Sequence, residues 1–262
     1  MNDDKALGRC FGVILAMVIL SAIFIIAPHV PSFNDDTESV EFRMGDDFVD
    51  VDIRMGDLDG YIGGIYRVGT AFMFSNMYVT PNDPTVDRVY ALLDVRMSGM
   101  TDYERADYLL KFVQDNVIYV NDESAYHLWD YVQMPAETLY LGRGDCEDMA
   151  FLLYTLYLKA GLDAVVYVEP SHVSVGVNVD CNKSNYLTVD GKRYYSAEST
   201  GYFMIGSAWI DDDAWAFKPE IPLFPTFVLI LSVFGFVLIA FICWDDDRKT
   251  DSKRLTKNTI GV

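Results

Sequence analysis

Basic side chains are scarce in this sequence of 262 residues, which carries 20 Lys and Arg against 39 Asp and Glu. The imbalance falls between residues 29 and 218, where 32 acidic and 13 basic residues leave the whole net charge of −19. A protein that binds nucleic acid needs the opposite sign, because it must neutralise phosphates. The composition therefore excludes nucleic acid as a partner, and it would steer basic or amine-bearing molecules toward the surface.

Cysteine and histidine are also rare, with four and three residues. Cys10 and Cys243 lie at the two ends of the chain, and Cys146 and Cys181 lie in its centre. No CxxC pair occurs, so the common cysteine-based metal sites are absent, and we expect no metal and no cofactor. Two alternatives stay open for the central cysteines: a disulfide between them, or a zinc ion shared with His172 and a carboxylate.

Long uncharged hydrophobic runs occur only near the ends, at Phe11 to Ala27 and Leu223 to Trp244. Both are long enough to span a bilayer, and basic residues precede the first run and follow the second. The positive-inside rule then predicts a two-pass protein of the cell membrane with both termini in the cytoplasm. A cleaved signal peptide is the alternative for the first run. The expected organisation is a cytoplasmic N-terminus at 1–10, a transmembrane helix at 11–28, an acidic extracytoplasmic region at 29–100, a domain at 101–219, a transmembrane helix at 223–244 and a basic cytoplasmic tail at 245–262.

The acidic region at 29–100 has weak signals. Alternating apolar residues from Phe48 to Ile53 predict one or two strands, and this region is either an extra subdomain or an extension of a larger sheet. A helix is predicted from Asp83-Pro84 to Val95, because proline suits the first turn. Four aspartates resemble a calcium loop but lack its regular spacing, so we expect a solvated loop at Asp50, Asp52, Asp57 and Asp59.

Two helices are predicted in the next part of the chain. Thr101 and Glu104 form a capping box, and an apolar stripe follows at Ala106, Leu109, Leu110, Val113 and Val117. Further along, Asp145 is a candidate N-cap and Asp148 a candidate capping-box partner, so a second helix should begin at Cys146 and end before Gly161. Its apolar face is formed by Met149, Leu152, Leu153, Leu156 and Ala160.

Cys146 lies on the buried side of that helix, at its N-terminus. The positive end of the helix dipole favours a thiolate there, which is the nucleophilic form of cysteine. Glu147 and Asp148 oppose this effect because their negative charges repel the thiolate. A cationic partner is therefore required if Cys146 is to react.

The strands after this helix supply such a partner. Ala164 to Val168 is a predicted strand, and strict alternation over Ser171 to Val179 places His172 on a polar face opposite four core valines. Asp190-Gly191 marks a hairpin turn, and Glu198 ends the second strand of that hairpin, within reach of an imidazole on a neighbouring strand. Asp190 is the competing acid.

Nucleophile, base and orienting acid together form the pattern of covalent catalysis. We therefore take Cys146, His172 and Glu198 as candidate catalytic residues, with backbone N–H groups at the first helical turn as an oxyanion hole.

Several of these stretches resemble a known family, the transglutaminase-like superfamily of papain-related folds, and in particular its bacterial and archaeal membrane members. The matching pieces are Phe112-Val113-Gln114 with Ile118-Tyr119, Pro135-x-Glu137-Thr138-Leu139, Gly144-Asp145-Cys146-Glu147-Asp148, His172-Val173, and Tyr194-Tyr195 with Glu198-Ser199-Thr200. The resemblance implies an α+β fold with an antiparallel sheet packed on the cysteine helix and a transmembrane helix on each side. It also implies Cys146 as nucleophile, His172 as general base and acid, and Glu198 as third member, where the family usually has Asp.

The resemblance further implies an acyl-enzyme formed on an amide or ester carbonyl and passed to water or to an amine. We expect hydrolysis of peptide or isopeptide bonds in surface proteins or cell-wall peptides, so a cysteine peptidase or amidase rather than a cross-linking enzyme. By analogy with papain-like enzymes, Gln133 and Trp129 are candidates for polarising the carbonyl. A membrane-tethered binding or structural module that keeps the fold without catalysis is the alternative. The sequence does not indicate an oligomeric state.

Overall fold

The computed structural model describes residues 36–58, 78–127 and 131–219. These belong to one compact unit, residues 31–222. Among the described residues, no helix is long and apolar enough to cross a membrane. The predicted spans at 11–28 and 223–244 and the candidate Trp129 lie outside the described residues.

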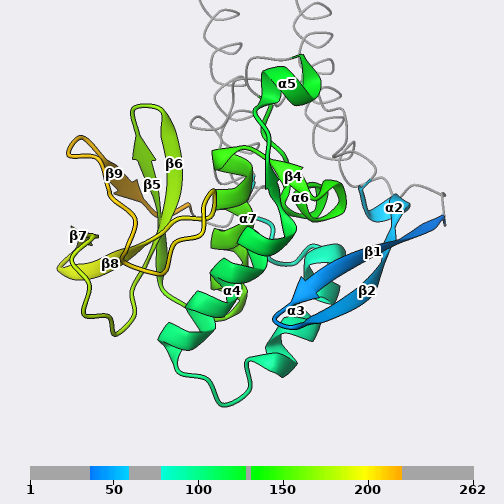
Figure 1. Ribbon diagram of the computed structural model, residues 1–262, viewed down its shortest axis with the longest axis horizontal. Coiled ribbons are helices and arrows are strands. Elements are labelled where there is room, and N and C mark those ends of the chain that lie inside the picture. The colour runs from blue at the N-terminus through cyan, green and yellow to red at the C-terminus, as the bar shows by residue number, and fades with distance from the viewer. Residues whose placement is uncertain (1–35, 59–77, 128–130, 220–262) are drawn as a thin grey trace, which may run out of the picture. The chain divides into compact units, whose positions relative to one another are not determined.

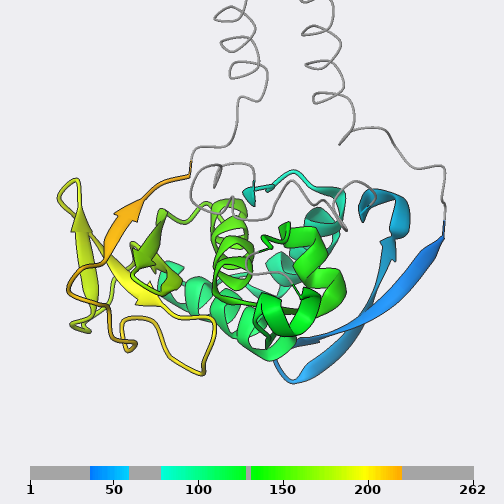
Figure 2. The ribbon, with the colours of Figure 1, turned by 90° about the horizontal axis from the view of Figure 1, so that it is seen from above.

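The helices lie together in the middle of this unit (Figures 1 and 2), and they supply many of the residues of its apolar core. Both predictions for the first two long helices are confirmed: Asp83 Oδ1 accepts the Thr85 N–H at 2.8 Å, and the Glu104 carboxylate accepts the Thr101 N–H at 2.8 Å. Such caps satisfy N–H groups that the helix itself leaves unpaired. The helices are α2 (Met55–Leu58), α3 (Pro84–Arg96), α4 (Asp102–Asn116), α5 (Asp122–Tyr126), α6 (Pro135–Leu141) and α7 (Cys146–Lys159).

Helix α7 is the centre of the unit, because all its residues from Glu147 to Tyr157 are buried. Its predicted start is confirmed: the Asp148 carboxylate reaches back to the Asp145 N–H at 3.3 Å. The predicted end is confirmed as well, since the chain turns at Gly161 with a φ of +71°. A helix buried on all sides needs elements around it, and α4, α6 and the strands β5 (Ala164–Glu169) and β6 (His172–Val177) contact it.

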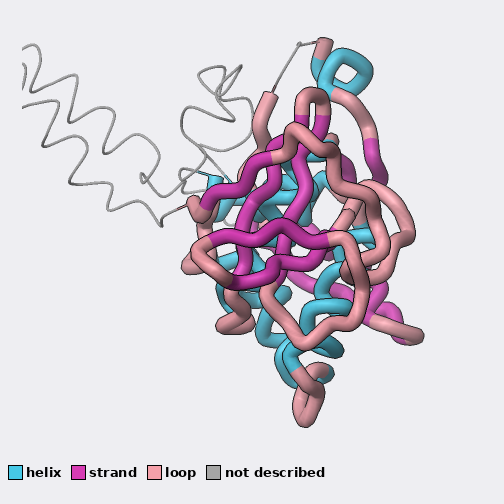
Figure 3. Tube along the Cα trace, turned by 90° about the vertical axis from the view of Figure 1, so that its left-hand side faces the viewer, coloured by secondary structure: helices cyan, strands magenta, loops and turns pink. Residues whose placement is uncertain are grey.

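A five-stranded sheet, with all its neighbouring strands antiparallel, covers one side of α7 (Figures 1 and 3). The order is β7-β8-β6-β5-β9, and its antiparallel pairing agrees with the predicted α+β fold. The hairpin at Asp190-Gly191 is confirmed, with φ of 49° and 78° at its two central residues. The strands are β5 (Ala164–Glu169), β6 (His172–Val177), β7 (Tyr186–Val189), β8 (Lys192–Ala197) and β9 (Trp215–Phe217).

The prediction of a polar face on β6 was wrong. Ser174 and Gly176 are buried, although they share a face with His172. The Tyr167 ring from β5 lies so close to Gly176 that a Cβ there would be 2.4 Å from it. Tyr167 forms a second apolar cluster with Val165 and Tyr194. Both faces of the sheet are therefore covered, because neighbouring strands place large side chains over small polar ones.

The acidic N-terminal part forms a separate hairpin of β1 (Thr37–Met44) and β2 (Asp47–Arg54), so it is not an extension of the larger sheet (Figure 2). Its inner face joins the core through Phe42, whose ring centroid lies 5.7 Å from that of Phe112 on α4. The loop expectation for the aspartates was wrong. Asp50 and Asp52 lie on the exposed face of β2, and Asp57 in α2 pairs with Arg88 at 2.8 Å. Asp59 lies outside the described residues.

Candidate active site

Cys146 is the first residue of α7 and follows a short strand, β4 (Arg143–Gly144), that pairs in parallel with β3 (Ile118–Tyr119). The Ile118 N–H donates to the Gly142 carbonyl at 2.9 Å. Gly144 is required here, because a Cβ would lie 2.7 Å from the Asp148 side chain that caps the helix. The glycine-containing run thus lets the chain turn tightly into α7 and fixes the position of the cysteine.

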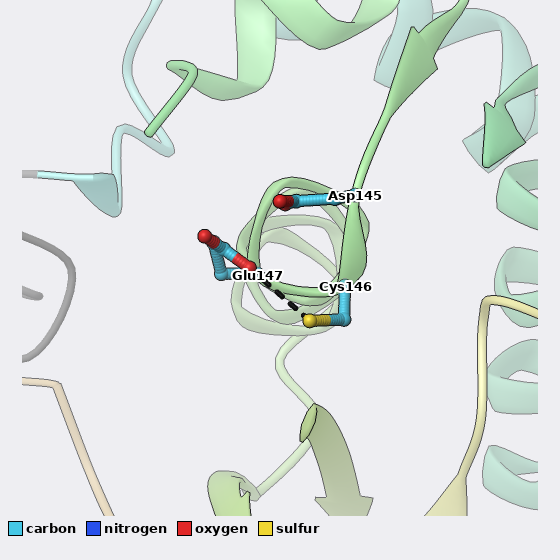
Figure 4. A group of neighbouring side chains, drawn as sticks. All are labelled: Asp145, Cys146 and Glu147. Atoms are coloured by element: carbon cyan, nitrogen blue, oxygen red, sulfur yellow. Dashed lines mark hydrogen bonds between the residues drawn. The ribbon is translucent and has the colours of Figure 1, made fainter. Parts of the chain in front are cut away.

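The Cys146 thiol is half-buried and donates a hydrogen bond to Glu147 Oε2 at 3.1 Å (Figure 4). Burial raises the pKa of this thiol well above its usual value, and the Glu147 carboxylate raises it further. The backbone N–H of Val173 acts in the opposite direction as a donor to the sulfur. The expected effect of the helix dipole is therefore outweighed, and the thiol is protonated in this arrangement.

His172 and Glu198 form a hydrogen-bonded pair, with 2.7 Å between His172 Nε2 and Glu198 Oε2. The other carboxylate oxygen of Glu198 accepts the Thr200 N–H at 2.7 Å and the Thr200 hydroxyl at 2.6 Å. The hydrogen bond to Glu198 raises the pKa of His172 above its ordinary value, although burial opposes this. Burial would raise the pKa of Glu198, but hydrogen bonds from His172 and Thr200 prevail and lower it. This pairing follows from topology, because β6 and β8 are neighbours in the sheet.

Strand β6, which begins at His172, also contacts the cysteine. Val173, the residue after His172, reaches the Cys146 sulfur through its backbone, and α7 packs on β6. No described residue hydrogen-bonds the second ring nitrogen of His172, Nδ1. The structure therefore gathers the three predicted residues at the starts of α7 and β6 and the end of β8. The competing acid Asp190 lies exposed in the β7–β8 turn, while His172 pairs with Glu198.

The described part of the chain contains neither the disulfide nor the zinc site that the sequence left open for Cys146 and Cys181. Cys146 and Cys181 are free thiols, so the disulfide is absent. Among the described residues, the groups close enough to share an ion include neither His172 nor Cys181, which rules out the zinc site in this arrangement. Cys181 instead lies near the Ile205 carbonyl, 3.9 Å away.

Gln133, a candidate for polarising the carbonyl, is only 1% exposed. Its backbone N–H donates to Asp148 Oδ1 at 2.7 Å, and its Nε2 donates to the Tyr126 hydroxyl at 3.1 Å. These contacts connect Gln133 to the cap of α7. The side-chain amide nitrogen is committed to Tyr126, so no contact with the sulfur follows from them.

The acids at the cap of α7 are buried together with Asp122, a group that the sequence did not predict. The carboxylate oxygens of Asp122, Asp145 and Asp148 lie within 4.8 Å of one another, and so do ligand atoms of Asp145, Cys146 and Glu147. Burial raises the pKa of Asp122 to about 6 and also raises those of Asp145 and Asp148. The carboxylate oxygens of Asp122, Asp145 and Asp148 are close enough together to bind one divalent cation. The D-C-E-D run was a visible signal, but Asp122 joins it only through tertiary structure.

Residues 92–216 match the profile of the family described as the transglutaminase-like superfamily. This segment belongs to that superfamily. The transglutaminase-like segment runs from α3 into β9 and includes Cys146, His172 and Glu198, and its mixed helices and antiparallel sheet agree with the α+β prediction.

The chain also aligns with a solved structure described as a "putative protease" from Parabacteroides distasonis, at 12% identity and a TM-score of 0.33. The alignment covers 70% of this chain and 44% of that one, so the chain spans less than half of that protein's length. A TM-score of this size does not establish a common fold. No curated protein matches the sequence.

Proposed function

We propose that this protein is a thiol enzyme of the transglutaminase-like type, which acts on amide or isopeptide bonds through an acyl-enzyme at Cys146. The observation that carries the proposal is the hydrogen bond of 2.7 Å between His172 and Glu198. His172 begins β6, and the backbone of the following residue, Val173, contacts the Cys146 sulfur. Nucleophile, base and orienting acid are the three roles that such chemistry requires.

The chemistry follows from the ring atoms. Glu198 holds Nε2 of His172, so Nδ1 is the nitrogen available to take the thiol proton. The thiolate attacks the carbonyl carbon, and backbone N–H groups at the start of α7 stabilise the oxyanion. As the C–N bond breaks, His172 returns the proton to the leaving amine. Water then attacks the thioester with His172 as base, which releases the acid and restores the thiol.

The first step requires a change at Glu147. In the structure the thiol donates to Glu147, so that hydrogen bond must break before the proton passes to His172. A protonated His172 would then stabilise the thiolate, which the negative charges of Glu147 and Asp145 otherwise destabilise. Because Glu198 raises the pKa of His172, the imidazolium is available over a wider range of pH.

The setting of the proposed enzyme comes from the sequence. We propose that the terminal runs hold it in the cell membrane, with the domain outside and both termini in the cytoplasm. Peptide, protein or cell-wall amides are the proposed substrates, and hydrolysis is preferred over cross-linking. The acidic surface supports basic or amine-bearing substrates by steering them.

A second candidate function is a non-catalytic tethered module. The observation in its favour is the protonated thiol bound to Glu147, which is not a reactive state. Such a module would keep the fold and use its surface for binding.

Alkylation by iodoacetamide separates the two functions, with mass spectrometry to locate the modified cysteine in the full chain. If Cys146 is a catalytic nucleophile, it reacts faster than Cys181 near neutral pH, and His172→Gln slows it by about tenfold or more. Cys181 is the internal control, because it is a half-buried free thiol that lies near the Ile205 carbonyl and not at a helix N-terminus. Equal rates at the two cysteines, with no effect of His172→Gln, would leave only the binding module.

A further inference from the structure

Gln114, in the last turn of α4, makes an unusual set of contacts for a residue far from Cys146 in sequence. It is 9% exposed, and its Nε2 lies 2.8 Å from the Glu198 carbonyl, 2.7 Å from the Gly201 carbonyl and 3.0 Å from the Phe203 carbonyl. The two N–H bonds of one buried amide are thus shared among three backbone oxygens of a single loop. No other described side chain shares this arrangement.

The loop that receives these bonds is irregular. Strand β8 ends at Ala197, and residues 198–203 form no helix or strand. His172 and Gln114 are the only described side chains outside this loop that hydrogen-bond to it. The neighbouring segment is fixed separately, where the Gly206 N–H donates to the Ser196 carbonyl at 2.7 Å. The backbone at Glu198 therefore depends on Gln114.

This dependence reaches the catalytic pair. Both Glu198 carboxylate oxygens are already committed, one to His172 and the other to Thr200. The Glu198 side chain cannot adjust to a displaced backbone without losing one of these bonds. A displacement of about 1 Å in a reacting group costs up to about a hundredfold in rate, because the productive geometry is narrow.

We infer that Gln114 is a positioning residue for catalysis: its amide holds the Glu198 backbone so that the carboxylate meets His172 Nε2. This inference rests on the proposed function. It predicts that the loss of the amide lowers the pKa of His172 toward its ordinary value, since the Glu198 hydrogen bond is the largest cause of the raised pKa.

The test is Gln114→Met, which keeps the length of the side chain and removes its hydrogen bonds. Asn116→Leu is the matched control, because Asn116 also ends α4 with an amide, but that amide binds the Arg43 carbonyl of β1 at 2.8 Å. Two quantities are measured in the full chain: the pH dependence of Cys146 alkylation by iodoacetamide, and the titration of the His172 ring by NMR. Thermal unfolding records the loss of stability, which we expect in both variants.

The expected result is a fall in the His172 pKa and about tenfold slower alkylation of Cys146 in Gln114→Met only. A His172 pKa equal to that of the unmodified chain, or an equal shift in Asn116→Leu, would overturn the inference. If Gln114→Met does not fold, Gln114→Asn replaces it, since this shorter amide no longer reaches all three carbonyls and should shift the same pKa in the same direction.

The two proposals fail in different ways. If His172→Gln leaves alkylation of Cys146 unchanged, the proposed function fails, and the NMR titration of His172 still decides whether Gln114 positions Glu198. If alkylation depends on His172 and the Gln114→Met profile matches that of the unmodified chain, only the inference about Gln114 fails.

Discussion

At the scale of single residues, the environment of Cys146 combines two opposing influences. Burial and Glu147 raise the pKa of the thiol, while the Val173 N–H at the start of β6 lowers it. In the proposed mechanism the His172–Glu198 pair supplies a cation to the thiolate, and the hydrogen bond to Glu198 raises the pKa of the imidazole. Reactivity therefore depends on which neighbour, Glu147 or His172, takes the thiol proton.

Glu147→Gln should make Cys146 more reactive. The amide removes the negative charge that repels the thiolate, so the pKa of the thiol falls and alkylation at a given pH becomes faster, by roughly threefold to tenfold. The rate of iodoacetamide modification between pH 6 and 9 measures this. Glu123→Gln, an exposed change in α5, is the control. A slower reaction in Glu147→Gln would mean that Glu147 assists the thiol instead.

Glu198→Gln should lower the pKa of His172, because the neutral amide can still accept a hydrogen bond but no longer favours the imidazolium. In the unmodified chain the His172–Glu198 pair stabilises the fold fully below the ordinary pKa of histidine, and this stabilisation is lost as the pH rises through the raised pKa of His172. Glu198→Gln should therefore lower the free energy of unfolding most at a pH below that raised pKa. Denaturant titrations at pH 5 and pH 9 measure the difference. Asp190→Asn, in the exposed turn, should show none. Equal losses at the two pH values would contradict the pairing.

Asp122→Asn should stabilise the protein at neutral pH. The pKa of Asp122 is raised from 3.8 to about 6, so the carboxylate is increasingly unfavourable as the pH rises between these values. The asparagine can still accept the Tyr131 N–H, which Asp122 Oδ2 accepts in the structure. We expect a gain on the order of 1–2 kcal/mol at pH 7 and almost none at pH 4 by urea unfolding. A loss at pH 7 would show that the charge itself is required.

At the scale of elements, the contact between β6 and β5 explains why the sheet is covered on both faces. The Tyr167 ring needs the space that Gly176 leaves, and its hydroxyl binds the Tyr194 carbonyl on β8. The side chains of Tyr167 and Tyr194 do not bury His172 completely, because His172 is the first residue of β6. The end of the strand is therefore where a polar side chain stays partly exposed.

Gly176→Ala should destabilise the protein by about 1–3 kcal/mol, because the added Cβ would lie 2.4 Å from the Tyr167 ring and force it out of place. Urea unfolding measures the loss. Ser174→Ala, on the same face of the same strand, adds no atom and is the control. If the two substitutions cost the same, the close contact at Gly176 is not restrictive.

At the scale of the whole molecule, two parts join one core. The β1–β2 hairpin contributes Phe42 and Ile53 to the same apolar cluster as α4, α7 and the inner face of the sheet. The acidic N-terminal part is thus integral to the described unit, although its strands pair only with each other. The matched family segment begins after this hairpin, at residue 92.

The proposed membrane topology predicts opposite labelling of two introduced cysteines. Asn182→Cys, an exposed position of the central unit, should react with a membrane-impermeant maleimide in intact cells. Ser252→Cys, in the basic tail, should react only after the cells are permeabilised. The parent chain without these substitutions provides the background. Labelling of Ser252→Cys in intact cells would overturn the predicted cytoplasmic tail.

Much of this protein was determined by local sequence. The cap at Thr101, the start of α7 after Asp145 and the turn at Asp190-Gly191 depend on neighbours within a few residues, so their positions could be predicted and are confirmed. The triad candidates could be named from residue types and the resemblance to a family. Their roles remain predictions.

Only the tertiary structure decided which groups meet. The contact of His172 with Glu198, the burial of Asp122 beside the cap of α7 and the contact of Gln114 with the Glu198 loop each join residues far apart in the chain. The burial of the predicted polar face of β6 was also decided by tertiary structure, because the alternation within one strand does not show which side chains the neighbouring strands place over it. Local hydrogen bonds fix where an element begins, but long-range packing fixes what surrounds it, and the pKa of each group follows from those surroundings.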